Sequence, residues 1–126
     1  MSFLLDTSTL IDLFVNRKDA PRIRDYLQSK FFSVSTVTFY EINKTKSPDP
    51  RLDVFFKNCN LVSLDPESAK RSSEIYKKLR ERGEMINELD ILIAGISIQN
   101  NLELVTKDND FKKIAVIEPD FKLKLF

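Results

Sequence analysis

The chain of 126 residues contains no histidine, one cysteine and two glycines. The absence of histidine excludes Ser-His-Asp and Cys-His catalysis and zinc sites built on imidazole ligands. The single cysteine, Cys59, excludes an internal disulfide and favours a reducing, cytoplasmic compartment. No apolar run approaches the roughly 20 residues of a membrane span, and the N-terminus lacks the basic region and long apolar stretch of a secretion signal. We therefore expect neither a membrane segment nor a secreted protein.

Hydrophobic residues make up 42% of the chain and charged residues 31%, which is typical of a globular protein. This length fits one domain, covering residues 1–126. The 20 basic and 19 acidic residues leave a net charge of +1, which neither requires nor excludes a nucleic-acid partner. The catalytic groups that remain are carboxylates, hydroxyls, lysines and arginines. Such hard oxygen ligands favour Mg²⁺ or Mn²⁺ over zinc or copper.

Short apolar runs alternate with helical patterns along the chain. Strands are predicted at residues 2–5, 31–35, 61–64, 102–106 and 115–117. Helices are predicted at residues 7–15, 36 to about 44, 51–58, 66 to about 82, and 87 to about 100. A further helix is predicted to begin at Pro21. Asp65 and Pro66 are a strong helix start, Gly83 is a helix stop, and Asn87 caps the next helix. This alternation predicts a three-layer α/β/α domain with a mostly parallel sheet of four to five strands.

Four acidic residues, each flanked by apolar residues, lie where such a fold could bring them together. Asp6 ends the first strand, and Asp108 follows the fourth. Glu41 lies on the helix after the second strand, and Asp90 lies in the first turn of the helix before the fourth. Sites in parallel sheets form beyond the carboxyl ends of the strands, where the strand order reverses. Two ionised acids ~4 Å apart repel by about 4 kcal/mol at an effective dielectric of ~20, so a cluster requires a retained proton or a cation.

Each of these acids also has an ordinary structural explanation. Asp6 could cap the first helix, and Glu41 could be a surface acid. Asp90 could belong to a cap arrangement with Asn87, and Asp108 could cap the turn that follows it. Separate explanations do not account for the placement of all four at apolar-flanked ends of elements, so we favour a shared site.

The ordered motifs resemble the PIN-domain ribonucleases that form the toxin half of VapBC-type toxin–antitoxin modules. The segments are LLDTSTLIDLF, TVTFYEI, LDILIAGIS and LVTKDNDF, and together they span nearly the whole chain in the family's order. No single motif is specific, but the ordered set is. The chain departs from the family's pattern at Glu88 and Asp110, which add acids near Asp90 and Asp108. Either Asp108 or Asp110 could therefore be the direct ligand, and we favour Asp108.

The resemblance implies metal-dependent endonucleolytic cleavage of RNA phosphodiester bonds. One divalent ion, Mg²⁺ or Mn²⁺, would lower the pKa of a bound water, and a second would stabilise the leaving oxygen. Thr7, Ser8 and Thr106 would orient the ligands or bind phosphate, although Thr7 and Ser8 could be helix-start residues only. The implied partners are an RNA substrate, a cognate antitoxin and a second copy of the chain in a homodimer. The implied catalytic and metal-binding residues are Asp6, Glu41, Asp90 and Asp108, with Asp110 as a further metal ligand.

Other functions compete with this interpretation. A catalytically silent PIN-fold module would bind RNA without cutting it. A receiver-like, Mg²⁺-dependent phosphoacceptor would use Asp6, Asp65 and Lys107. That class has paired acids after the first strand and a proline after the lysine, whereas here Thr-Ser follows Asp6 and Asp108 follows Lys107. A haloacid-dehalogenase-like phosphatase requires Asp-x-Asp, which the sequence DTS lacks.

The helix that begins at Pro66 and the segment of residues 121–126 each carry apolar side chains that could serve packing or binding. The helix that starts at Pro66 carries Ala69, Ile75, Tyr76 and Leu79 beside many charges, and residues 121–126 are unusually apolar. Both segments could pack against their own domain. Alternatively, their exposed apolar surface could serve a homodimer or an antitoxin.

Overall fold

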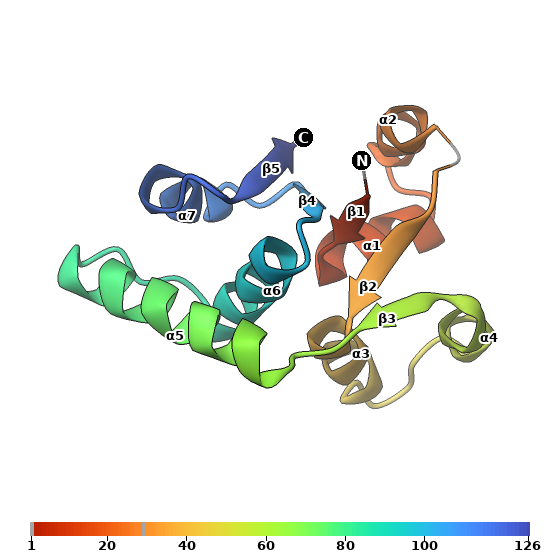
Figure 1. The fold of residues 1–126 in the computed structure, drawn as a ribbon. Helices are drawn as coiled ribbons and strands as arrows, with labels where there is room; N and C mark the ends of the chain where they lie inside the picture. The colour runs from red at the N-terminus through yellow and green to blue at the C-terminus, as the bar shows by residue number, and fades with distance from the viewer. Residues whose placement is uncertain (1, 29) are drawn as a thin grey trace.

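The protein folds around a five-stranded parallel sheet with the strand order β3-β2-β1-β4-β5 (Figure 1). A computed structural model describes residues 2–28 and 30–126. The strands are β1 (Phe3–Leu5), β2 (Phe32–Ser35), β3 (Asn60–Val62), β4 (Glu103–Thr106) and β5 (Lys122–Leu125). The helices are α1 (Thr7–Phe14), α2 (Ala20–Leu27), α3 (Thr36–Asn43), α4 (Pro50–Asn58), α5 (Pro66–Glu81), α6 (Glu88–Gln99) and α7 (Phe111–Ile117).

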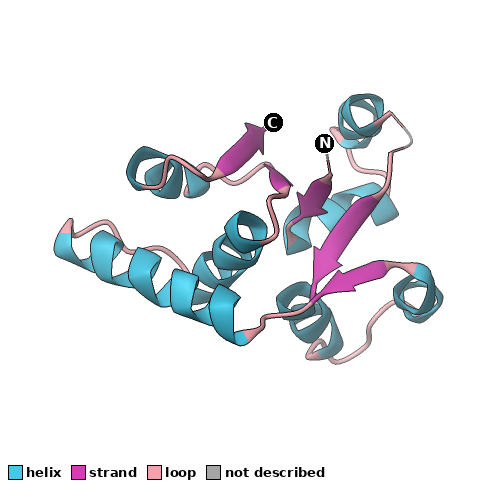
Figure 2. Cartoon of the chain, viewed as in Figure 1, coloured by secondary structure: helices cyan, strands magenta, loops and turns pink. Residues whose placement is uncertain are grey.

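Each face of the sheet has its own hydrophobic core. Helices lie on both sides of the strands (Figure 2), which confirms the predicted three-layer α/β/α architecture. Successive residues of a strand point to opposite faces. Leu4 and Leu104 accordingly pack in one core with residues of α5, α6 and α7. Leu5 and Val105 pack in the other core with residues of α1, α2 and α4. The sheet is therefore buried on both sides, as parallel sheets are.

The prediction of a fifth strand at residues 115–117 is wrong. These residues belong to α7, whose buried Phe111 and Ile114 are spaced for one face of a helix. The fifth strand is β5, in which Leu123 and Leu125 alternate with lysines at the period of a strand. It pairs with β4 from Lys122 opposite Glu103 to Leu125 opposite Thr106. The apolar tail is therefore part of the domain's own sheet.

Helix α5 also buries its apolar face within the domain. Ile75 and Leu79 are fully buried in the core that α6 shares. The predicted helix start is confirmed, because the Asp65 side chain accepts a hydrogen bond from the Ser68 N–H at 2.8 Å. The predicted stop is confirmed as well, since Gly83 follows the helix with a φ of 66°, which a glycine adopts without strain. The cap at Asn87 is confirmed by its acceptance of the Leu89 N–H at 2.9 Å.

Helices α5 and α6 approach each other very closely at Gly95. A Cβ atom added to Gly95 would lie 1.9 Å from the Ser72 Oγ and 2.8 Å from the carbonyl oxygen of Ser68. Ser68 and Ser72 are both buried, so small side chains line this contact. The contact fixes the position of α6, which carries Asp90 in its first turn. Within the described ranges, no helix has the length and apolarity to cross a lipid bilayer.

Candidate active site

The carboxyl ends of three neighbouring strands define the edge on which the candidate site lies. Leu5 is in register with Val105 on one side and with Val34 on the other. Asp6 therefore follows β1 directly beside Thr106 at the end of β4. The first and fourth strands are neighbours, and the strand order reverses between them. This is the place where open parallel sheets form their ligand sites.

Asp6 is a buried carboxylate whose two oxygens both accept hydrogen bonds. The residue is 3% exposed. Oδ1 accepts the Thr9 N–H at 3.1 Å and so caps α1, while Oδ2 accepts the hydroxyl of Thr106 at 2.7 Å. Burial raises the pKa of Asp6 above its ordinary value, the negative charge of Asp108 adds to this, and the hydrogen bonds from Thr9 and Thr106 oppose it. The capping role and a place at the site therefore coexist in one side chain.

Glu41 extends from α3 and is held by a chain of hydroxyl groups. The Thr7 hydroxyl donates to Glu41 Oε1 at 2.6 Å. Because that bond uses the only proton of Thr7, the Thr38 hydroxyl is the donor in the 3.0 Å contact between the two threonines. Ser35 in turn donates to Thr38 at 3.4 Å. Sequence reasoning missed Thr38, although its position three residues before Glu41 on one helix was a usable signal.

Asp90 provides the clearest sign that the acids converge. The pKa of Asp90 is raised to about 7, first by burial and then by the negative charges of Asp108, Asp6, Glu41 and Asp110. These residues come from α6, α3 and the ends of β1 and β4. Four sequence-distant carboxylates therefore lie near enough to disfavour ionisation of a fifth.

Asp108 and Asp110 follow β4 in a tight turn. The Asp108 N–H donates to Thr106 Oγ1 at 3.0 Å, and the Asp110 N–H donates to Asp108 Oδ1 at 2.9 Å. Thr106 therefore links Asp108 to Asp6 through two hydrogen bonds. Asp108 is half-buried, whereas Asp110 is exposed. Ser8 is exposed on the first turn of α1.

An ion-pair group beside the site was not anticipated from the sequence. Asp12 on α1 is only 4% exposed. Its carboxylate lies 2.7 Å from Lys107 Nζ and 3.2 Å from Arg17 Nη1. Lys107 also lies 3.2 Å from Asp19, and hydrogen bonds to Asp12 and Asp19 raise the pKa of Lys107. An acid inside the apolar run LIDLF was the only available signal.

The donor set suits a hard divalent cation, since it consists of carboxylate and hydroxyl oxygens. Among residues 2–28 and 30–126, no three acidic or cysteine side chains stand close enough to enclose a metal ion. A cation at this edge would therefore require the carboxylates to turn toward one another. Their mutual repulsion, recorded in the raised pKa of Asp90, is what such a cation would relieve.

The chain belongs to the PIN domain family, which it matches over residues 3–117. It is 29% identical over 124 residues to Ribonuclease VapC1 of Methanocaldococcus jannaschii, covering 98% of this chain and 85% of that protein. It is 26% identical over 125 residues to the tRNA(fMet)-specific endonuclease VapC of Salmonella typhimurium, covering 93% of this chain and 95% of that one.

Solved structures show the same fold over almost the whole chain. One is VapBC2 from Rickettsia felis bound to a DNA fragment from their promoter, with a TM-score of 0.78 at 20% identity, covering 100% of this chain and 99% of that one. Another is VapBC-1 from nontypeable Haemophilus influenzae, with a TM-score of 0.78 at 21% identity, covering 99% and 98%. At these identities the likeness concerns the fold.

Proposed function

We propose that this protein is a Mg²⁺- or Mn²⁺-dependent endoribonuclease whose metal ligands are Asp6, Glu41, Asp90 and Asp108. The observation that carries the proposal is the placement of acids from the ends of β1 and β4, from α3 and from α6 at one edge of the sheet, where burial and then the neighbouring negative charges raise the pKa of Asp90. A divalent cation bound among these carboxylates would offset their repulsion, and the oxygen ligands suit Mg²⁺ or Mn²⁺. The family membership and the ribonuclease names of the relatives support RNA as the substrate.

The chain's own residues hold these ligands in defined positions. Thr106 fixes Asp6 from one side and Thr7 fixes Glu41 from the other, each through a hydroxyl donor. A divalent ion, when bound, supplies a Lewis acid that lowers the pKa of water and offsets the negative charge of the phosphodiester. Ser8, exposed beside Asp6, can donate its hydroxyl to a phosphate oxygen. Asp110 stays a candidate for a further ligand, since its charge also reaches Asp90.

The same proposal includes the biological setting. We take the chain to be the toxin of a toxin–antitoxin pair, inhibited by a cognate antitoxin and forming a homodimer. Its support is the likeness to VapC ribonucleases and to solved VapBC proteins. A cytoplasmic location accords with the free thiol of Cys59.

The test is RNA cleavage by the purified protein with Mn²⁺ or with EDTA. We expect Asp90→Asn and Asp108→Asn each to lower the cleavage rate by about 100-fold or more, the equivalent of a few kcal/mol of lost metal stabilisation. Asp53→Asn is the matched control. Asp53 lies in the first turn of α4, as Asp90 lies in the first turn of α6, but Asp53 is exposed. Asp53→Asn should cut RNA at the wild-type rate.

Three results would count against the proposal. Cleavage by Asp90→Asn and Asp108→Asn at the wild-type rate would contradict the ligand assignment. Cleavage by the wild-type protein in EDTA would contradict metal dependence. Binding of RNA without cleavage at any Mn²⁺ concentration would identify the catalytically silent module instead.

A further inference from the structure

We propose that Lys107 and Asp12 form a positioning pair that holds the loop between β4 and α7, and with it Asp108, in place for metal binding. The inference rests on the proposed function and extends it to Lys107 and Asp12. Neither residue contacts the oxygens of the proposed metal ligands, and we assign neither a contact with the substrate. Lys107 lies between Thr106 and Asp108 in the sequence. Its side chain is bound to α1 rather than to the acid cluster.

The loop is attached on both sides of Lys107 through different contacts. Thr106 donates its hydroxyl to Asp6, and the Asp108 N–H donates to Thr106. The Lys107 ammonium donates to Asp12 Oδ2 at 2.7 Å and lies 3.2 Å from Asp19 Oδ2. The Thr106 hydroxyl therefore attaches the loop to the end of β1. The Lys107 ammonium attaches it to α1 and to the start of α2. A shift of the loop would break the ion pairs as well as the hydrogen bonds.

Burial makes this attachment stronger than an ordinary surface ion pair. Asp12 is 4% exposed, and a buried carboxylate requires charged or hydrogen-bonding partners. Its other cation, Arg17, has a side chain that is 64% exposed, compared with 32% for Lys107. Lys107 is therefore the less solvated of the two partners and holds Asp12 most firmly. Because two carboxylates already occupy its ammonium, Lys107 is poorly suited to bind an RNA phosphate instead.

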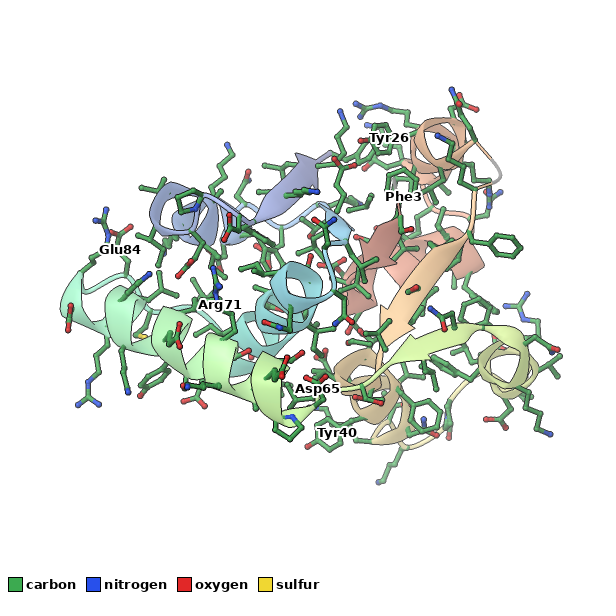
Figure 3. All side chains as sticks on the ribbon, viewed as in Figure 1. Phe3, Tyr26, Tyr40, Asp65, Arg71 and Glu84 are labelled. Atoms are coloured by element: carbon green, nitrogen blue, oxygen red, sulfur yellow. The ribbon has the colours of Figure 1, made fainter. Side chains whose placement is uncertain are left out.

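The chain contains a second lysine in an equivalent setting, which supplies a matched control. Lys78 on α5 lies 2.9 Å from Glu118, a carboxylate that is 3% exposed. Arg71, labelled in Figure 3, extends from α5 to the same carboxylate at 2.9 Å. Glu118 thus has one lysine and one arginine, as Asp12 has. Glu118 follows the C-terminal end of α7, whereas the loop that carries Asp108 precedes that helix. Removing the Lys78–Glu118 ion pair should therefore not loosen this loop.

The experiment measures Mn²⁺ binding by titration calorimetry on purified Lys107→Met, Lys107→Arg and Lys78→Met proteins, beside thermal unfolding in EDTA. We expect Lys107→Met to weaken Mn²⁺ binding by about tenfold, as removal of an outer support of a metal site does. Lys107→Arg should recover most of that loss, because it keeps the positive charge. Lys78→Met should lower the melting temperature and leave Mn²⁺ binding at the wild-type level.

RNA cleavage provides an independent comparison. Lys107→Met should raise the Mn²⁺ concentration for half-maximal cleavage by about the same tenfold, with a much smaller change in the rate at saturating Mn²⁺. If Lys107→Met does not fold, Asp12→Asn/Lys107→Met provides the same test, because it removes the buried charge together with its partner. That double variant should show the same weakened binding.

Each outcome is decisive for one of the two proposals. Wild-type Mn²⁺ affinity in Lys107→Met or in the double variant would overturn the positioning role and leave the proposed function standing. Equal weakening in Lys107→Met and Lys78→Met would also overturn it, since general destabilisation would then explain both. A wild-type protein that neither binds Mn²⁺ nor cleaves RNA would overturn the proposed function, and the positioning role with it.

Discussion

Asp6 illustrates why a structural and a functional explanation of one side chain need not compete. Its Oδ1 caps α1 and its Oδ2 accepts from Thr106, whose own oxygen accepts from the Asp108 N–H. An asparagine here could keep the cap but would point its NH₂ group at the Thr106 hydroxyl. Thr106 would then lose the acceptor that fixes its orientation. Substitution of Asp6 therefore perturbs structure and site together, and Asp90 is the cleaner position for experiments.

Replacing Asp90 should change how stability depends on pH in the metal-free protein. Its folded-state pKa of about 7 lies above the ordinary 3.8, so the folded state binds more protons than the unfolded state between these values. The free energy of unfolding contributed by Asp90 therefore falls as pH rises through that window and levels off above it. Asp90→Asn lacks this loss. We expect the variant to gain on wild type by about 2 kcal/mol between pH 4 and pH 8, after halving for solvent screening of this half-buried group.

Denaturant unfolding in EDTA at several pH values measures this difference. Asp53→Asn, which changes an exposed acid on α4, is the control measured beside it. A pH-independent difference for Asp90→Asn would mean that neither burial nor the surrounding acids raise the pKa of Asp90.

At the scale of elements, local signals predicted most boundaries. Asp65, Gly83 and Asn87 act within three residues of the helix ends that they define, so their effect is visible in the sequence. The alternation of strands and helices predicted a mostly parallel sheet, but the order of its strands came from the structure alone. The error at residues 115–117 arose because a run of three apolar residues fits a helix or a strand equally well, and the pairing of β5 with β4 decided the matter.

The supporting contacts of the site were beyond sequence reasoning for a different reason. Lys107 and Asp12 are 95 positions apart, and Thr7 and Glu41 are 34 apart. Neither pair has a spacing rule, because the fold alone brings the partners together. The acids themselves could be proposed because their apolar neighbours marked the ends of elements.

Helix packing leads to a stability prediction at Gly95. An alanine there would place its Cβ 1.9 Å from the Ser72 Oγ and 2.8 Å from a backbone oxygen of α5. We expect Gly95→Ala to lower the free energy of unfolding by about 2–3 kcal/mol, since α5 and α6 must separate. Gly83→Ala is the comparison. A Cβ atom at residue 83 meets no other atom within 4 Å, so the only cost is the strain of an alanine at a φ of 66°. The loss for Gly83→Ala should be about 1 kcal/mol. Chemical denaturation giving Gly95→Ala the smaller loss would contradict the close approach.

For the whole molecule, metal binding and folding should be linked. A cation that binds the folded state alone stabilises it by about 2.7 kcal/mol at a hundredfold excess over its dissociation constant. We therefore expect Mn²⁺ to raise the melting temperature of wild type and of Asp53→Asn equally. It should raise that of Asp108→Asn less. Thermal unfolding with and without EDTA tests this, and a wild-type melting temperature indifferent to Mn²⁺ would be incompatible with the proposed site.

The central position of β1 has a consequence for the synthesis of the protein. Residues 3–5 leave the ribosome well before residues 103–106, which form β4, one of the two strands that flank them (Figure 1). A nascent chain can pair β1 with β2 early, but Thr106 reaches Asp6, and Asp108 reaches Asp90, only after residue 108 has left the ribosome. A chain that terminates before residue 106 therefore lacks Thr106 and Asp108, and its site is incomplete. An enzyme that cleaves RNA, as proposed, thus becomes a hazard to its own messenger only after the codons for β4 and Asp108 have been translated.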